Sequence, residues 1–314
     1  MNTVSMLRSL ITSLAFLLIN CQAGDDMSTG DHLDTSNYRY FESITVDGIQ
    51  RYYLLNLPPN YYQQDTFPLV IVLHGAGGSA LQCEKDYKLT ERANAENYVI
   101  VYPEGVRNDG VFGLRTWNAG SCCDFAAQRN VNDVGFISKL IDKLVADYKI
   151  DRKRIYVTGM SNGAMMAYRL ACEIPGKIAA IAAVSGTMLT TSPCDPSRAV
   201  PVLHIHSERD TKVPPQGGYG IGGYYYPPVD SVLKVWSAAD TCDSKDPAVS
   251  DFQNYTLYQW QNGRNNVRID YYLTKDGGHA WPGGIKSRER ADTPSTAINA
   301  NDLIWAFFSN YKLP

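Results

Sequence analysis

The chain has 314 residues, of which 44% are hydrophobic and 19% charged, a composition that excludes a disordered or fibrous protein. Lysine and arginine number 29 against 32 aspartate and glutamate residues, and the resulting net charge of -3 disfavours nucleic acid as a partner. We therefore expect a folded globular protein that binds small or neutral ligands.

The first residues have the layout of an export signal. Arg8 precedes an apolar run over 10–19, and small and acidic residues follow. The run is shorter than the roughly 20 residues that span a membrane. We expect a signal peptide over 1–23 and a secreted or periplasmic protein. Alternatively, a lipoprotein signal over 1–20 leaves Cys21 acylated at the cell surface, and this lipid is then the expected membrane contact.

After a polar stretch to about residue 37, apolar β-rich runs alternate with helical patterns and no repeat or linker interrupts them. A single domain over 38–314 is the simplest interpretation. Apolar residues recur every three to four positions over 134–148 and 298–308, which predicts two helices packed on a sheet. Strands are expected at 44–46, 52–57, 68–73, 98–102, 154–157, 179–184, 200–206 and 267–273.

This alternation predicts an α/β fold, with a mostly parallel sheet and helices on both of its faces. In such folds the active groups gather in the loops at the carboxyl ends of the strands. The functional residues are therefore sought in those loops.

Ser161 lies in the segment GMSNG at 159–163, between a predicted strand and a predicted helix. In this G-x-S-x-G setting the serine occupies a tight turn, and the residues two before and two after it must be tiny for strand and helix to approach. Gly159 and Gly163 meet that need. We expect Ser161 to be a nucleophile at a helix N-terminus, where negative charge is favoured. The alternative is a plain connecting turn.

A serine nucleophile needs a base, and the chain has five histidines. His32 lies in the polar N-terminal stretch, His74 ends a strand, and His204 and His206 stand within one, where a structural role is favoured. His279 follows the last predicted strand in a glycine-rich loop. Its position satisfies the chain order of serine, acid and histidine in this kind of fold, so His279 is the predicted base.

The carboxylate that orients the histidine is expected just after a strand. Asp210 follows the strand at 200–206, where it would accept the imidazole N–H and fix the tautomer. Glu208 is the nearest competitor. Two backbone amides should form the oxyanion hole: that of Asn162 and one from the loop HGAGG at 74–78, where Ala76 is preferred over Gly75.

Removal of Cys21, by cleavage or by acylation, leaves six cysteines, an even number in an exported chain. Up to three disulfides are possible, with 15 connectivities. Cys122 and Cys123 are adjacent, and because a bond between them requires a small ring, we expect each to reach a distant partner. A zinc site is disfavoured, since no ligand spacing for a metal accompanies these cysteines, so no metal is expected.

Seven motifs follow one another along the chain: LHGAGG at 73–78, YPEG at 102–105, TWNAGSCC at 116–123, NDVGF at 132–136, GMSNGAMMAYRL at 159–170, VLHIH at 202–206 and GHAWP at 278–282. In these motifs the chain resembles the secreted esterases of the polyhydroxybutyrate depolymerase type, which include bacterial feruloyl esterases of the first carbohydrate esterase family. The resemblance implies an α/β-hydrolase fold and carboxylic ester hydrolysis without a cofactor, with Ser161, Asp210 and His279 at the triad positions. Relatives commonly have glycine where Ser207 stands here.

Aromatic residues near these motifs are candidates for substrate binding. Trp281, Trp117 and, in the insertion GGYGIGGYYYPP at 217–228, Tyr224 offer flat apolar faces, with core packing or an exposed loop as the alternatives. The favoured function is an exported feruloyl esterase acting on feruloylated or acetylated polysaccharide or its oligosaccharides. Acetyl xylan esterase and polyhydroxyalkanoate depolymerase are alternatives of the same class, and a non-catalytic surface binding protein is an alternative of another.

Overall fold

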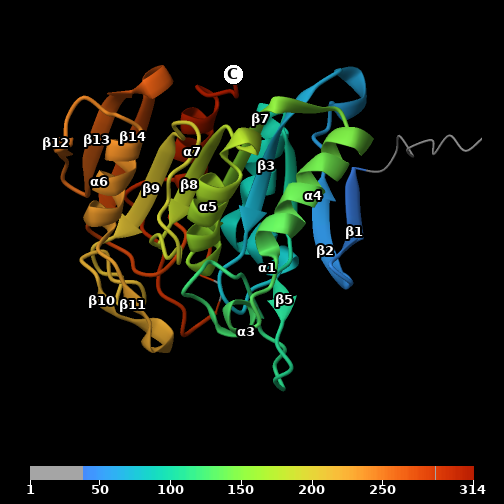
Figure 1. Ribbon diagram of the computed structural model, residues 1–314, viewed down its shortest axis with the longest axis horizontal. Coiled ribbons are helices and arrows are strands. Elements are labelled where there is room, and N and C mark those ends of the chain that lie inside the picture. The colour runs from blue at the N-terminus through green and yellow to red at the C-terminus, as the bar shows by residue number, and fades with distance from the viewer. Residues whose placement is uncertain (1–37, 287) are drawn as a thin grey trace, which may run out of the picture. The chain divides into compact units, whose positions relative to one another are not determined.

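The computed structural model describes residues 38–286 and 288–314, so the predicted signal segments 1–23 and 1–20 and Cys21 lie outside the described residues. A ten-stranded sheet runs in the order β1-β2-β4-β3-β7-β8-β9-β14-β13-β12 (Figure 1). Its strands are β1 Arg39–Val46, β2 Ile49–Asn56, β3 Phe67–Leu73, β4 Val99–Pro103, β7 Ile150–Met160, β8 Ala180–Val184, β9 Val202–Ser207, β14 Val267–Thr274, β13 Tyr255–Gly263 and β12 Ala248–Asp251.

The centre of the sheet is parallel and its two ends are antiparallel. From β4 through β3, β7, β8 and β9 to β14, each neighbouring pair is parallel. The pairs β1/β2, β2/β4, β14/β13 and β13/β12 are antiparallel. All seven residues of β3 are buried, as expected of a strand covered on both faces. The predicted α/β class with a mostly parallel sheet is confirmed.

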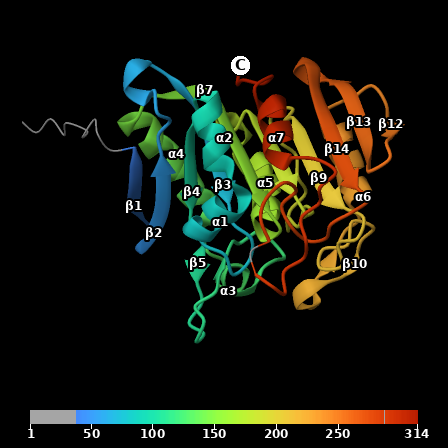
Figure 2. The same cartoon turned by 180° about the vertical axis from the view of Figure 1, so that it is seen from behind.

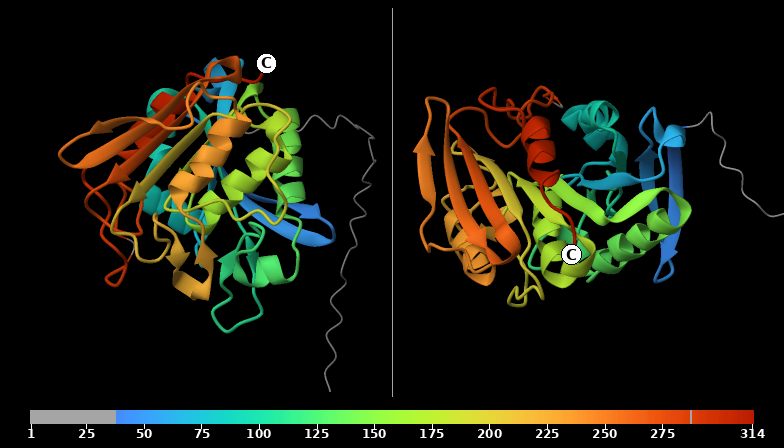
Figure 3. Two further views of the ribbon diagram at one scale, coloured as in Figure 1. Left: turned by 60° about the vertical axis from the view of Figure 1, so that its left-hand side comes forward. Right: turned by 90° about the horizontal axis from the view of Figure 1, so that it is seen from above.

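Helices cover both faces of the sheet, as predicted. One face carries α4 Asp133–Asp147, α5 Asn162–Glu173 and α6 Val229–Ala239, and the other carries α1 Ala80–Tyr87, α2 Leu89–Glu96 and α7 Ala300–Phe308. Figures 1 and 2 show these two sets from opposite sides, and the turned views of Figure 3 show helices on both sides of the sheet. Each set packs into its own apolar core, with Leu140, Met166 and Trp236 in the first and Leu89, Ile304 and Phe308 in the second.

Side chains define where several helices begin. Ser79 Oγ accepts the Gln82 amide before α1, and Asn132 Oδ1 accepts the Gly135 amide before α4. The first residue before α5 is Ser161, whose side chain makes no such cap. The amides at the start of α5 therefore remain available to another acceptor.

Shorter elements lie in the connections. Two small hairpins are formed by β5 Val106–Arg107 with β6 Arg115–Thr116 and by β10 Gly218–Tyr219 with β11 Tyr225–Tyr226. The remaining elements are α3 Asp124–Gln128 and the 3-10 turns Tyr61–Gln63, Pro175–Lys177, Ile221–Gly223 and Arg264–Asn266. No helix of the described residues is long and apolar enough to cross a membrane.

The prediction that Cys122 and Cys123 each bond a distant partner is wrong. The two bond to each other, and Cys172 bonds Cys194, whereas Cys83 and Cys242 are free thiols. The reason lies in the fold: Cys83 packs in the core beneath α1, and the other three cysteines pack against the core on the α4 and α5 face. Cys122 and Cys123 belong to a separate apolar cluster.

Candidate active site

Ser161 occupies a strained turn between β7 and α5. Its φ of 56° and ψ of -122° are rare for a residue with a side chain and cost about 1–3 kcal/mol. The turn is held from both sides, because the Ser161 amide donates to the Val184 carbonyl at 2.8 Å and its carbonyl accepts the Met165 amide at 3.0 Å. Such an over-determined outlier is typical of a functional position. It places the serine at the N-terminus of α5.

The glycines on either side of this turn lie where no side chain fits. A Cβ on Gly159 would stand 2.7 Å from the Gly163 carbonyl carbon and 2.8 Å from the Leu73 carbonyl oxygen. A Cβ on Gly163 would overlap the carbonyls of Leu73 and His74. These two residues must be tiny, as the sequence predicts, because the backbones of β3, β7 and α5 are in direct contact at this turn.

Asp210 lies in the loop after β9, where its carboxylate is buried and held on both oxygens. The amides of Lys212 and Val213 donate to Oδ1, each at 2.9 Å, and His279 Nδ1 lies 2.7 Å from Oδ2. Burial alone would raise the pKa of Asp210, but hydrogen bonds from His206 and His279 hold it well below its ordinary value. The carboxylate is therefore ionised. The competitor Glu208 is exposed to solvent.

His279 lies in the loop after β14, and its backbone is fixed by a second carboxylate. The His279 amide donates to Asp292 Oδ2 at 2.8 Å, and Lys212 Nζ lies 3.2 Å from the same oxygen. Because Asp210 is an acceptor, the His279 Nδ1 carries the proton of their hydrogen bond. In the neutral ring the Nε2 atom is then a lone-pair acceptor, which is the arrangement that a general base requires.

The topology brings these residues to one edge of the sheet. Ser161 follows β7, Asp210 follows β9 and His279 follows β14, and in the sheet β7, β8, β9 and β14 are consecutive parallel strands. Their carboxyl ends therefore share an edge. The structure brings Asp210 and His279 into contact and places Ser161 at the same edge.

Behind Asp210 stands a buried chain of three further side chains. Tyr168 Oη lies 2.8 Å from His204 Nδ1, and His204 Nε2 lies 3.0 Å from His206 Nδ1. His206 Nε2 lies 2.8 Å from the Val213 carbonyl and 3.2 Å from Asp210 Oδ2. Since both of these oxygens only accept, His206 Nε2 carries a hydrogen. With both imidazoles neutral, every donor of the chain then points toward Asp210. Burial lowers the pKa of His204 well below its ordinary value.

Ser207 links the two loops that hold Asp210 and His279. Its hydroxyl donates to the Asp276 carbonyl at 3.0 Å and accepts the Arg209 amide at 3.1 Å. The Asp276 carboxylate in turn accepts from the Thr296 amide at 2.9 Å. The residue that departs from the family pattern thus has a structural task, because it ties the start of the histidine loop to the start of the aspartate loop.

The loop at 74–78 lies against the nucleophile. A Cβ on Gly75 would stand 3.5 Å from the Ser161 Cβ, so the two residues are in direct contact. Ala76 is exposed, and the amides of Ala76 and Asn162 have no hydrogen-bond partner among the described residues. The Asn162 side chain is tied to the backbone of Trp117, at 2.7 Å to its amide and 3.0 Å to its carbonyl. Both predicted oxyanion donors are thus free to bind an anion.

Two of the three aromatic candidates are core residues. Trp117 is fully buried, and its indole N–H donates to the His74 carbonyl at 3.0 Å. Trp281 is 3% exposed, stacks on Tyr87 and donates to Asn301 Oδ1 at 2.8 Å. Neither indole has a face open to a ligand, so the packing alternative holds for both. They support the loops of the site from behind.

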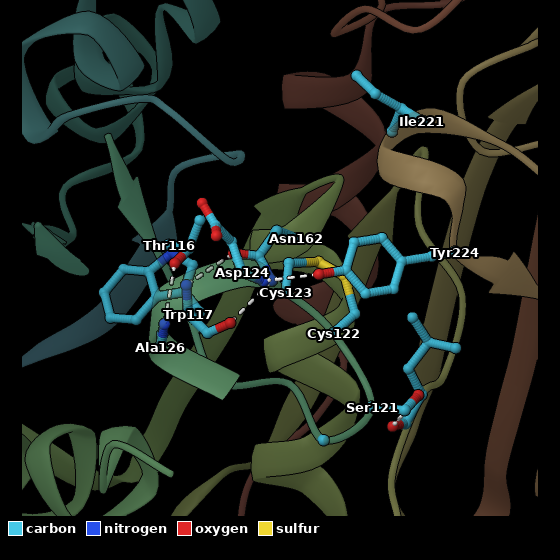
Figure 4. The surroundings of a disulfide bond; sticks show 12 residues. Thr116, Trp117, Ser121, Cys122, Cys123, Asp124, Ala126, Asn162, Ile221 and Tyr224 are labelled. Atoms are coloured by element: carbon cyan, nitrogen blue, oxygen red, sulfur yellow. Dashed lines mark hydrogen bonds between the residues drawn. A yellow bond between two sulfur atoms is a disulfide. The ribbon is translucent and has the colours of Figure 1, made fainter. Parts of the chain in front are cut away.

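Tyr224 is half-buried beside the Cys122–Cys123 disulfide. Its hydroxyl accepts the Asp124 amide at 2.9 Å, and Figure 4 shows the disulfide lying between the Tyr224 ring and Asn162. The two cysteines and the Tyr224 ring belong to one apolar cluster, which also contains Met165, Leu189 and Val213. Through Met165, this cluster adjoins the first turns of α5, the helix that begins after Ser161.

Several residues of the site escaped the sequence reasoning. Asp292 lies in a polar loop far from any strand, and Tyr168 and His204 contribute only through contacts made across the sheet. For His206 a signal existed, because a histidine two residues from another on one strand shares a face with it. No group of three or more potential ligands in the described part of the chain is arranged to hold a metal ion.

Comparison with known proteins relates the chain to esterases. Residues 51–213 match the family model described as Esterase PHB depolymerase. The chain is 27% identical to the bifunctional acetylxylan esterase/xylanase XynS20E of Neocallimastix patriciarum, over 82% of this chain and 32% of that protein. It is 25% identical to feruloyl esterase B of Piromyces equi, over 72% of this chain and 42% of that protein. It thus spans less than half of either relative.

Among solved structures, the acetyl xylan esterase from Aspergillus awamori superposes with a TM-score of 0.61 at 15% sequence identity. The match covers 86% of this chain and 99% of that chain. At so low an identity the similarity establishes the fold alone.

Proposed function

Because the chain belongs to the esterase family of the polyhydroxybutyrate depolymerase type, we propose that it hydrolyses carboxylic esters through Ser161, His279 and Asp210. The observation that carries the proposal is the 2.7 Å hydrogen bond between His279 Nδ1 and the buried Asp210, at the sheet edge where the strained Ser161 also lies. A carboxylate held ionised beside an imidazole fixes its tautomer and stabilises the imidazolium that forms during reaction.

The reaction proceeds in two halves. Ser161 Oγ attacks the ester carbonyl carbon while His279 Nε2 takes its proton, and the amides of Asn162 and Ala76 bind the oxyanion. The C–O bond to the alcohol breaks, and the alcohol leaves with the proton from Nε2. Water then gives a proton to His279 and attacks the acyl-enzyme, which releases the acid and restores Ser161. The chemistry needs no cofactor.

We propose that the acyl or alcohol group of the substrate lies against the cluster of Tyr224 and the Cys122–Cys123 disulfide. This cluster is apolar, adjoins α5 at its start and contains a half-buried ring. Beyond it, Tyr219 and Tyr225 of the β10–β11 hairpin are 79% and 56% exposed. Exposed aromatic faces of this kind suit a sugar ring or a cinnamoyl ring.

Feruloylated polysaccharide is the favoured substrate, and acetylated xylan is the second candidate. The names of the relatives, acetylxylan esterase and feruloyl esterase, support both, and polyhydroxyalkanoate is a third candidate from the family description. A non-catalytic binding protein has no need for the pairing of Asp210 with His279. We further propose a single catalytic domain over 38–314, exported by the signal at 1–23 or anchored by a lipid on Cys21.

A test of the chemistry uses the mature protein and a short-chain chromogenic ester. Hydrolysis by the wild type, and its loss by at least about 1,000-fold in Ser161→Ala, is expected from removal of the nucleophile. Asn162→Ala is a poor control because its side chain holds Trp117, whereas Ser231→Ala on the exposed surface of α6 should keep full activity. Equal hydrolysis by Ser161→Ala would disprove the mechanism.

A substrate panel separates the candidates. Methyl ferulate, acetylated xylan and polyhydroxybutyrate are compared by kcat/KM for the same preparation. We expect the highest value for the feruloyl ester. The mass of the exported protein decides the processing, because cleavage after Ala23 and acylation of Cys21 give different N-termini.

A further inference from the structure

A cavity of about 820 Å³ lies on the α6 side of the sheet, between that helix and the outer strands β12, β13 and β14. Its volume falls in the range of ligand sites in proteins. Ser161, Asp210 and His279 are not among the described residues that line it. The cavity is therefore distinct from the site proposed above.

The floor of this cavity is formed by apolar and aromatic side chains of three strands. Val249 of β12 pairs with Tyr258 of β13, and Tyr258 pairs with Tyr271 of β14, so the three side chains share one face of the sheet. The rings of Tyr258 and Tyr271 are stacked, with centroids 5.3 Å apart and planes at 24°. No hydrogen bond joins either phenol hydroxyl to another residue that the structure describes. Tyr271 is 4% exposed, so the half-buried ring of Tyr258, which packs on it, is the aromatic surface that a ligand can reach, with its hydroxyl left to bind that ligand.

The rim of the cavity is polar and predominantly acidic. Asp230 and Lys234 project from α6, Asp246 lies opposite, and Glu208 closes one end. All four side chains are exposed, and Lys234 Nζ stands 3.7 Å from Asp246. Three carboxylates against one ammonium give this rim a negative balance, which disfavours an anionic ligand.

We propose that this cavity binds a segment of a neutral polysaccharide chain. A sugar ring has apolar C–H faces that stack on aromatic rings, and hydroxyl groups on its edge that donate to carboxylates and accept from an ammonium. The half-buried ring of Tyr258 and the rim of Asp230, Asp246 and Lys234 supply both kinds of contact. The inference rests on the proposed function, since it makes the glycan part of the ester substrate the ligand.

The position of the cavity connects it to the catalytic loops. Glu208 precedes Asp210 by two residues in the loop after β9, and Leu273, also in the lining, lies on the strand that leads into the His279 loop. A glycan chain seated in the cavity thus lies beside the strands that carry the acid and the base. Binding there raises the residence of a polymeric substrate and leaves the chemical step on a small ester unchanged.

Binding is measured by calorimetry with a neutral xylo-oligosaccharide that carries no ester. We expect Tyr258→Ala to weaken binding by roughly tenfold or more, because it removes the stacking face. Tyr258→Phe should keep most of the affinity. The matched control is Tyr255→Ala, three residues earlier on β13, whose ring lies on the opposite face against Phe252 and Tyr272. It should bind as the wild type does.

Asp230→Ala is a second variant, at an exposed position in the first turn of α6, and its melting temperature is compared with that of the wild type. It should weaken binding several-fold. For both Tyr258→Ala and Asp230→Ala, we expect a higher KM for acetylated or feruloylated xylan and an unchanged kcat/KM for a chromogenic acetate. Wild-type protein that does not bind the neutral oligosaccharide, or both variants binding as wild type, would overturn the inference.

The two proposals fail separately. Calorimetry with the unesterified glycan gives a result whether or not the protein is an esterase. A wild type that binds the oligosaccharide but hydrolyses no ester contradicts the proposed function alone. A wild type that hydrolyses esters but binds no oligosaccharide contradicts the cavity alone.

Discussion

His206 and His279 donate to the same oxygen of Asp210, and they are its two neighbours in a buried hydrogen-bond chain. The distances to Asp210 Oδ2 are 3.2 Å from His206 Nε2 and 2.7 Å from His279 Nδ1. Two donors on one oxygen fix the carboxylate more firmly than one, and the backbone amides of Lys212 and Val213 fix the other oxygen. His206 is therefore a positioning residue, which acts on His279 through Asp210.

Replacing His206 by Leu should lower kcat by roughly 10- to 100-fold, because Asp210 loses a donor and His279 loses its fixed aim. The KM for a small ester should change little. In His206→Gln the side-chain amide can still donate toward Asp210, so we expect part of the lost kcat to be restored. A purely structural role of His206 would give no such rescue of kcat. The measurement is kcat and KM on a chromogenic ester, with melting temperatures to compare folding.

A control for this prediction lies at the far end of the chain. Tyr168→Phe removes the hydroxyl that donates to His204 Nδ1. His204 and His206 separate this hydroxyl from Asp210 in the network. Its effect on kcat should stay below about threefold. A larger loss in Tyr168→Phe than in His206→Leu would contradict the assigned direction of the chain.

Ser207→Ala should loosen the link between the two catalytic loops. The change removes the donor to the Asp276 carbonyl and the acceptor of the Arg209 amide, both in a buried position. We expect a loss of about 1–2 kcal/mol in the free energy of unfolding and a several-fold drop in kcat. Urea denaturation and ester hydrolysis measure the two effects. Unchanged values for both would show that the link is dispensable.

Gly163→Ala should prevent the close approach of α5 to β3. Its added Cβ overlaps the carbonyls of Leu73 and His74, which are backbone atoms of a buried strand end and cannot yield without moving the strand. We expect a destabilisation of about 1–3 kcal/mol or more, and loss of activity. The matched control is Gly176→Ala, where the added Cβ meets nothing within 4 Å. Thermal unfolding of the two variants should differ by several degrees.

Residues that make local patterns were predictable from the sequence. The run at 68–73 is uniformly apolar because both faces of β3 are buried, and the stripe at 134–148 matches α4. Ser161, Asp210 and His279 follow strands whose order along the chain is visible in the sequence. The glycines on either side of Ser161 indicate a close approach of strand and helix, because any larger residue would overlap the neighbouring backbone.

Residues that act across the fold were not predictable in the same way. β13 was missed because its alternation is weak: one face carries Tyr258 and Trp260 and the other Leu257, so neither reads as polar. The burial of Trp117 and Trp281 depends on partners such as His74 and Asn301, which lie far away in the sequence. The pairing of Cys122 with Cys123 depends on where the other cysteines fall in space.

His74 holds the oxyanion loop in place through both ring nitrogens, and this makes stability depend on pH. Its Nδ1 lies 2.7 Å from the Gly75 carbonyl, an acceptor, so Nδ1 carries the proton, and its Nε2 accepts the Gly105 amide at 2.9 Å. Protonation of Nε2 would set two donors against each other. Burial, with lesser contributions from Arg115 and Arg51, lowers the pKa of His74 to about 4.

The unfolded chain binds a proton at His74 near pH 6.5, whereas the folded protein does so near pH 4, so the unfolded state holds more protons in between. Stability from this residue is therefore lost as the pH falls from about 6.5 to 4 and is level below that. The shift corresponds to about 3 kcal/mol. Asp240 opposes it, because burial raises its pKa to about 7 and acid stabilises the folded state there.

His74→Gln separates these opposing effects, because Gln keeps an acceptor for the Gly105 amide but does not titrate. The free energy of unfolding is measured by urea denaturation at pH 7 and pH 4 for both proteins. The wild type should lose about 3 kcal/mol more than the variant over this interval. The contribution of Asp240 is the same in the wild type and the variant, so it cancels in this comparison. Equal losses of stability would show that His74 does not stay neutral in the folded protein.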